Sequence, residues 1–128
     1  MAEVKEKDSM VETQKMKYSE NGLWILKTGQ QYRIGLSEKG QDDLGEVMFI
    51  EVPSQVTRIE KNETVIGLEG AKAVTELTSP FAGKVVSYHE ALADEPEKLN
   101  STDKESNWIV ELTDVDEAAF NALSDKIN

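Results

Sequence analysis

The 128-residue chain is long enough for one domain with its own core, and its net charge of −11 argues against nucleic-acid phosphate and anionic membranes as partners. It contains no cysteine, which excludes disulfides, thiol nucleophiles and thiolate metal sites. No apolar run approaches the length of a membrane span and no signal-peptide pattern opens the chain, so we expect a bacterial cytoplasmic protein, although a mature organellar protein would look the same.

The first part of the chain predicts a tail, a β-hairpin and a short helix. Residues 1–17 are polar and aperiodic, as expected for a flexible tail, and we place one domain over residues 18–128. Residues 18–27 and 31–36 carry clustered or alternating apolar side chains around a Thr28-Gly29 turn. Ser37 suits the N-cap of a short helix that runs to Leu44 and ends at Gly45.

The middle of the chain predicts a strand, a polar turn and a second hairpin. Residues 47–52 form a strand bounded by Pro53, with residues 47, 49 and 51 on one face and residues 48, 50 and 52 on the other. Residues 58–62 are turn-like. Residues 64–68 and 74–78 are β-rich and flank a turn with Gly70, Ala71 and Lys72, which indicates a hairpin with an accessible lysine at its tip.

The last third predicts two more strands and a terminal helix. We expect Gly83, after Ser79-Pro80, to need either a positive φ or a close approach that a Cβ would prevent. Strands at residues 84–88 and 107–112 flank an acidic surface loop with one helical turn near residues 96–99. Asp114 and Glu117 have capping-box spacing for the terminal helix. Its packing stripe would consist of Ala118, Ala119, Ala122 and Leu123.

The side chains offer no self-contained catalytic apparatus, so the chain is predicted not to be an enzyme. His89 is the only histidine, and we expect it on the surface. The acidic residues at positions 90, 94, 95 and 97 lack the spacing of a calcium loop. A carrier needs no acid, base or nucleophile of its own, because its cofactor supplies the chemistry. Taken alone, Lys72 is an ordinary turn lysine, and it becomes the candidate site only through the resemblance of the motifs around it to a carrier family.

The order of the motifs resembles the biotinyl/lipoyl carrier family and, within it, the glycine cleavage system H protein family. The segments that carry this resemblance are Ile34-Gly35-Leu36, residues 44–53, Glu69-Gly70-Ala71-Lys72-Ala73, Ser79-Pro80-Phe81-Ala82-Gly83-Lys84-Val85-Val86, residues 92–100 and Trp108 with the strand after it. Many short strands with few helices predict a small β-sandwich or flattened barrel. The resemblance implies a mainly β barrel-sandwich hybrid, with short peripheral helices and a C-terminal helix.

The resemblance also implies that lipoate is attached covalently to Lys72. Biotin-bearing hairpins place Met on both sides of the lysine, whereas Ala71 and Ala73 flank it here, which favours lipoate. Glu69 matches the glutamate of the H-protein attachment motif, and Gly70 stands where the family usually has Ser. We expect Glu69, Gly70, Ala71 and Ala73 to form the attachment hairpin around Lys72. A rival hypothesis is a pure interaction protein that kept the fold and lost the cofactor.

Besides Gly70, two further departures from the family pattern suggest a divergent, H-like protein. Gly22 replaces a usual histidine, and residues 103–107 lack the usual Pro-Tyr pair and glycines. The pattern resembles H-like proteins associated with a lipoate–protein ligase, a sirtuin-type ADP-ribosyltransferase and a macrodomain protein, which implies a redox relay, ADP-ribosylation and a link to oxidative stress. We expect this relay, served by dihydrolipoamide dehydrogenase, over the alternative, an authentic H subunit that carries methylamine from glycine decarboxylase to aminomethyltransferase.

Overall fold

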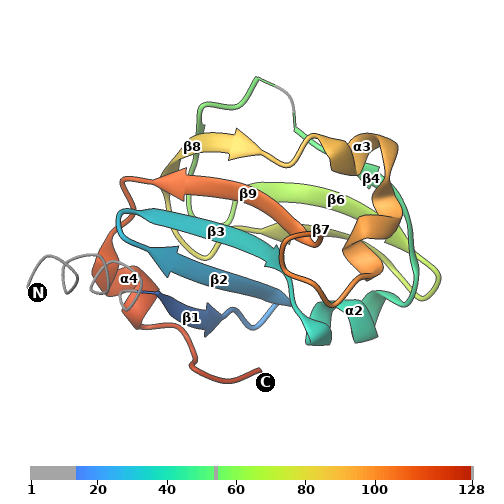
Figure 1. The fold of residues 1–128 in the computed structure, drawn as a ribbon, viewed down its shortest axis with the longest axis horizontal. Coiled ribbons are helices and arrows are strands. Elements are labelled where there is room, and N and C mark those ends of the chain that lie inside the picture. Colours follow the sequence, from blue (N-terminus) through green and yellow to red (C-terminus); the bar gives the residue numbers. More distant parts are fainter. Residues whose placement is uncertain (1–13, 54, 128) are drawn as a thin grey trace, which may run out of the picture.

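The fold is a sandwich of two antiparallel sheets, seen in a computed structural model that describes residues 14–53 and 55–127 (Figure 1). The larger sheet has the order β1-β2-β3-β9-β8-β5, and the smaller has the order β4-β6-β7. The six-stranded sheet contains β1 (Lys15–Tyr18), β2 (Leu23–Thr28), β3 (Gln31–Leu36), β9 (Trp108–Thr113), β8 (Gly83–Tyr88) and β5 (Arg58–Ile59). The three-stranded sheet contains β4 (Val47–Glu51), β6 (Thr64–Gly70) and β7 (Val74–Thr78). The predicted mainly β barrel-sandwich class is confirmed.

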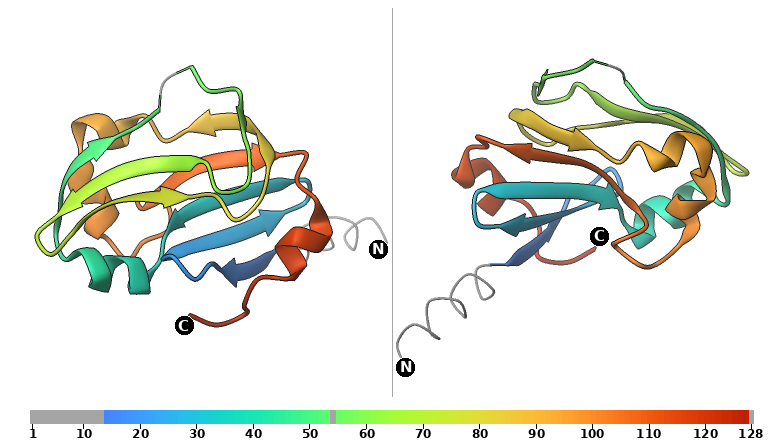
Figure 2. Two further views of the ribbon diagram at one scale, coloured as in Figure 1. Left: turned by 180° about the vertical axis from the view of Figure 1, so that it is seen from behind. Right: turned by 45° about the horizontal axis from the view of Figure 1, so that its top comes forward.

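Short helices lie at the periphery of the sandwich (Figures 1 and 2). They are α2 (Glu38–Leu44), α3 (Ala91–Asp94), the 3-10 helix η1 (Pro96–Asn100) and α4 (Glu117–Asn121). The predicted cap of α2 is confirmed, because the Ser37 side chain accepts a hydrogen bond from the Gly40 amide and Gly45 follows with φ of 70°. The turn predicted near residues 96–99 is η1, but α3 was not predicted.

Aliphatic and aromatic side chains fill the space between the sheets. Each strand of a sandwich turns alternate residues inward, so both sheets contribute to one core. Tyr32 packs edge-on against Phe81 and Phe120, with ring centroids 5.8 Å and 5.2 Å apart. Burying such a side chain contributes roughly 1.5–3 kcal/mol. Fully buried members include Leu23, Ile25, Ile34, Val65, Ile66, Leu92, Leu99, Ile109, Val110 and Leu112.

The boundary of the tail was placed too late in the chain. Residues 1–13 lie outside the described residues, but Lys15, Met16 and Lys17 belong to β1 and pair with Lys27, Leu26 and Ile25 of β2. The predicted strand over residues 18–27 is instead two strands joined by a turn. A short edge strand carries little periodicity of its own, because pairing with its neighbour defines it.

A bulge in β4 breaks the predicted alternation of faces. Val47 pairs with Gly70 and Phe49 with Glu69, so two residues of β4 oppose one step of β6. Val47 is 3% exposed, whereas Phe49 is 63% exposed, although both were assigned to one face. A bulge adds a residue without any marker in the apolar pattern, so the sequence could not show it.

Three smaller predictions also change. Ile59 lies in the segment predicted to be a polar turn, but it is buried and belongs to β5, where it pairs with Gly83 of β8. The cap of α4 is Asp116, whose side chain accepts from the Ala118 amide, whereas Asp114 has φ of 57° and precedes the helix. Phe120 leads the packing of α4, with Ala119 and Leu123 partly buried; Ala118 and Ala122 are exposed.

Candidate functional site

The hairpin between β6 and β7 carries Lys72 at its tip and lies against the C-terminal end of α2. The Lys72 amide donates to the Leu44 carbonyl at 2.8 Å, and the Ala71 amide donates to the Glu46 carbonyl at 2.9 Å. The Gly70 amide closes the turn on the Ala73 carbonyl at 2.9 Å. Main-chain groups of α2 and of the residues after it therefore position the lysine, and a free-standing turn does not.

The side chain of Lys72 is exposed to solvent and makes one polar contact. Its Nζ donates to the Asp42 carbonyl oxygen at 3.1 Å, in the last turn of α2. A cation is favourable there, since helix carbonyls accumulate partial negative charge at the C-terminus. The contact is solvent-exposed and easily broken, so the amine remains available to a partner's active site.

Two glycines allow the hairpin and the helix to approach this closely. Gly70 is buried, and a Cβ there would overlap the Leu44 carbonyl group. Gly45 has φ of 70°, and a Cβ there would lie 3.0 Å from Cγ of Lys72. Glu69, Ala71 and Ala73 are exposed around the lysine. The five residues of the predicted hairpin thus lie together, with Gly70 directed inward and the others accessible.

A cavity of about 200 Å³ lies beside the hairpin, between α2 and β7. Two carboxylates line it. Asp43 forms an ion pair with Lys39 at 2.9 Å, and Glu76 accepts a hydrogen bond from the Thr64 hydroxyl at 3.1 Å. The complete lining is Asn21, Gly40, Asp43, Leu44, Ala73, Thr75, Glu76 and Leu77. The cavity therefore adjoins the hairpin at Ala73, next to the lysine, and has two carboxylates in its wall, of which Asp43 is paired with Lys39.

The sequence did not single out Asn21, Asp43 or Glu76 as site residues. Asn21 lies in the turn before β2, and its side chain donates to the Thr78 carbonyl at 3.0 Å, which joins this turn to β7. The three residues are far apart in the chain. The only local signal is that Glu76 follows the hairpin lysine by four residues, and this spacing does not distinguish Glu76 from other exposed acids.

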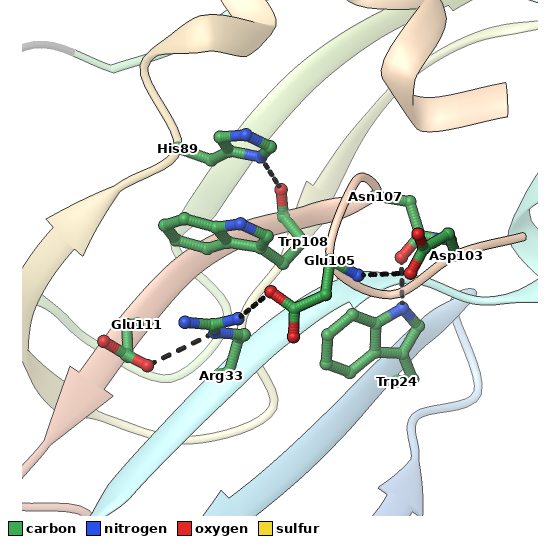
Figure 3. A network of polar contacts seen from close by, with 8 residues as sticks. All are labelled: Trp24, Arg33, His89, Asp103, Glu105, Asn107, Trp108 and Glu111. Carbon is green, nitrogen blue, oxygen red and sulfur yellow. Dashed lines mark hydrogen bonds and ion pairs between the residues drawn. The ribbon is translucent and has the colours of Figure 1, made fainter. Parts of the chain in front are cut away.

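The two segments that depart from the family pattern do not line this cavity. Gly22 has φ of 102°, and a Cβ there would lie 2.8 Å from Cα of Gly40. The loop at residues 103–107 instead lies by Trp24, whose indole N–H donates to Oδ1 of Asn107 at 2.9 Å (Figure 3). Both departures from the family pattern therefore lie outside the lining of the cavity by Lys72.

Trp108 is held between a cation and an imidazole on the outer side of the large sheet. The rings of Trp108 and His89 are stacked with centroids 4.4 Å apart (Figure 3). The guanidinium of Arg33, which belongs to β3, lies 4.5 Å from the centroid of the Trp108 ring. His89 is half-buried, with Nδ1 2.7 Å from the Trp108 carbonyl, so its description as a surface residue was incomplete. Arg33 also pairs with Glu111 at 3.3 Å.

The remaining features of the described residues do not compete with this site. A larger, open hollow of about 1280 Å³ lies at the other end of β7, by α4, and contains none of the predicted site residues. Over residues 14–53 and 55–127 no grouping of three or more His, Asp or Glu side chains suits a metal ion. None of the helices in those ranges has the length and apolar character to cross a membrane.

A sandwich of two antiparallel sheets with a lysine at the tip of an exposed hairpin defines a cofactor-carrier domain of the barrel-sandwich class. The model of the Glycine cleavage H-protein family matches residues 16–127. The chain belongs to the glycine cleavage H-protein family. Members of this family are non-catalytic proteins that carry a lipoate attached covalently to a lysine.

Individual relatives agree with this assignment. The glycine cleavage system H protein of Listeria welshimeri is 37% identical over 106 residues, which cover 83% of this chain and 85% of that protein. The protein of the same name from Bacillus cytotoxicus is 38% identical over 104 residues, which cover 80% and 82%. The crystal structure of a glycine cleavage system H protein from Mycobacterium marinum has a similar fold, with a TM-score of 0.67, 20% identity and coverage of 77% and 82%.

Proposed function

We propose that this chain is the H subunit of a glycine cleavage system and that Lys72 is its lipoyl-lysine. One observation carries the proposal: the exposed amine of Lys72 lies at the tip of a hairpin that adjoins a cavity with two carboxylates. A carrier of a methylamine group needs both an accessible arm and a place where a cationic amine can rest. The partners are then a lipoate–protein ligase, glycine decarboxylase, aminomethyltransferase and dihydrolipoamide dehydrogenase, in a bacterial cytoplasm.

The residues present suit the lipoyl group. Lys72 supplies the only atom that must react, and Ala71 and Ala73 leave space on either side of it. When attached, the group supplies thiol–disulfide chemistry at the end of a flexible arm. The tether keeps that chemistry at high effective concentration for each partner.

The protein's own contribution is to hold the lysine and to receive the cargo. Main-chain hydrogen bonds from the Lys72 and Ala71 amides to the carbonyls of Leu44 and Glu46 fix the origin of the arm. Glu76 and Asp43 place negative charge where a cationic amine would lie, and the walls from Leu44 and Leu77 are apolar. Such walls limit the access of water, which slows hydrolysis of the carried group.

The relay hypothesis is not retained. It rested on Gly22 and on residues 103–107, and neither segment lines the cavity beside Lys72. The relatives reported above are named glycine cleavage system H proteins. Nothing in the comparisons supports ADP-ribosylation, an oxidative-stress role, a sirtuin-type partner or a macrodomain partner.

Two measurements test the proposal in sequence. Incubation with a lipoate–protein ligase, ATP and lipoate should add one lipoyl group to the parent chain and none to Lys72→Arg, as read by intact mass. The lipoylated protein should then support glycine–bicarbonate carbon exchange by glycine decarboxylase at a rate comparable to that of an authentic H protein. If the protein is lipoylated but does not support glycine–bicarbonate carbon exchange, the proposed role in glycine cleavage is rejected, whereas the role as a lipoyl carrier is retained.

A further inference from the structure

The outer face of the β4-β6-β7 sheet carries exposed apolar side chains beside the candidate lysine. This sheet faces the viewer in the left panel of Figure 2. Phe49 is 63% exposed and Val74 is 76% exposed. Phe49 pairs with Glu69, and Glu69 pairs with Val74, so the three residues form one row across the sheet. Residues paired in this way project from the same face.

The geometry of β4 accounts for the outward position of Phe49. Without the bulge between Val47 and Phe49, the alternation of a strand would direct both side chains to the core. Phe49 and Val74 lie on either side of Glu69 in this row, so two large exposed apolar side chains lie close to the candidate lysine and favour contact with a partner there. Met48, in the bulge itself, is also 41% exposed.

The second row on this face is acidic. Glu51 pairs with Gly67, and Gly67 pairs with Glu76, two residues along each strand from the apolar row. Glu69 lies between Phe49 and Val74, and Glu51 and Glu76 lie beside them in the second row, so exposed carboxylates border both apolar side chains. Gly67 leaves the centre of the row without a side chain, so a partner's side chain can reach the sheet there. The complementary surface is an apolar recess edged by Lys or Arg.

We propose that this face, formed by the rows Phe49–Glu69–Val74 and Glu51–Gly67–Glu76, docks the enzyme that acylates Lys72. The inference rests on the proposed function. The unmodified amine reaches only one side-chain length from the hairpin, so the acylating enzyme must contact the protein surface next to it. An enzyme that only reduces or oxidises the dithiolane meets the far end of a long arm, so we expect its reaction to depend less on this face.

The chemistry of the acylation step explains why its rate depends on how the enzyme docks. The Nζ of Lys72 attacks the carbonyl of an activated lipoyl group, a C–N bond forms, the bond to the leaving group breaks, and the amine proton passes to a base of the enzyme. Nζ must first leave the Asp42 carbonyl and lose its charge. Apolar anchors at Phe49 and Val74 hold the hairpin in place during that exchange.

The test compares a double variant, Phe49→Ser with Val74→Ser, with a matched control, Val86→Ser. Val86 is 44% exposed and belongs to β8 of the other sheet. With a lipoate–protein ligase, ATP and lipoate, the double variant should lose about tenfold or more in kcat/KM through KM, and the control should stay within about twofold. Val74→Ser alone should give an intermediate loss. Urea unfolding should show that all variants keep the parent's stability within experimental error.

A second readout separates docking of the acylating enzyme from a general effect. After complete lipoylation, the double variant should be reduced by dihydrolipoamide dehydrogenase at the parent's rate; an equal loss in that reaction would overturn the assignment to the acylating enzyme. Unchanged kcat/KM for acylation of the double variant would reject the docking face and leave the carrier function intact. A parent chain that takes no lipoate would reject both.

Discussion

The amide of Lys72 donates to the carbonyl of Leu44 at 2.8 Å, and this hydrogen bond fixes the hairpin on the end of α2. The contact requires Gly70, because a Cβ there would overlap the same carbonyl. Helix C-termini leave carbonyls without helical partners, and the hairpin satisfies one of them here. The hairpin that carries Lys72 and helix α2 therefore form one structural unit.

Substitution of Gly70 should damage this unit. We expect Gly70→Ala to lower the free energy of unfolding by about 1–3 kcal/mol, because backbone must move to accept the methyl group. Gly67→Ala in the same strand is the control, since its Cβ would meet ordinary contacts from 3.5 Å outward. Urea denaturation of both variants measures the difference. Equal midpoints for the two variants would contradict the account.

Gly83 is constrained by packing. The predicted positive φ is absent, but the predicted close approach is present: a Cβ would lie 2.9 Å from Cγ2 of Val115 and 3.0 Å from Cδ1 of Leu112. Gly83→Val should destabilise the chain by about 1–3 kcal/mol through overpacking. The denaturation midpoint is the measurement, and Gly83→Ala should show a smaller loss. An unchanged denaturation midpoint for Gly83→Val would contradict the role of Gly83 in this close packing.

Tyr88 should make stability depend on alkaline pH. Its hydroxyl donates to the Val65 carbonyl at 3.0 Å, and burial raises its pKa from 10.0 to about 12. In that interval the folded chain keeps a proton that the unfolded chain releases, so the free energy of unfolding falls as pH rises from about 10 to about 12. Tyr88→Phe should flatten this fall. Parallel urea titrations from pH 9 to about 12 compare the variant with the parent; identical slopes would refute the assignment to Tyr88.

Glu76 should retain the carried amine. Glu76→Gln removes a charge from the cavity wall, so we expect the aminomethyl-loaded form to lose its cargo about twofold to fivefold faster than the parent, when both proteins have first been lipoylated to completion. Asp43→Asn should have a smaller effect, because Lys39 already offsets that charge. Intact mass over time measures the loss. The control is Glu97→Gln, which changes an exposed acid in η1. An equally fast loss of cargo in this variant would contradict the role of the cavity in holding the amine.

Local chemistry explains what the sequence could predict. Ser37 and Gly45 mark the ends of α2 because caps depend on a few adjacent residues. The hairpin was visible because β-rich segments flank Gly70 and Lys72. Those signals are contained in short windows, and the order of several such windows indicated the family and the fold.

Long-range contacts explain what it could not. The contact of the hairpin with α2 joins Lys72 to Leu44. These residues are far apart in the sequence, so no local pattern can predict that they meet. The cavity combines Asn21, Asp43 and Glu76 from three separate segments. Asp116 rather than Asp114 caps α4 because the backbone at Asp114 adopts φ of 57° before the helix begins. Tertiary packing decides each of these.

The main-chain anchoring of the hairpin has a consequence for protein turnover. Acylation of Lys72 breaks only the exposed contact of Nζ with the Asp42 carbonyl, while the hydrogen bonds to Leu44 and Glu46 remain. That contact is worth about 1 kcal/mol or less. Modified and unmodified chains are therefore almost equally resistant to unfolding, and proteases that degrade unfolded chains do not distinguish them. If Lys72 is the lipoyl-lysine, as proposed, a cell that lacks lipoate would keep the unmodified protein in folded form, ready for modification when the cofactor returns.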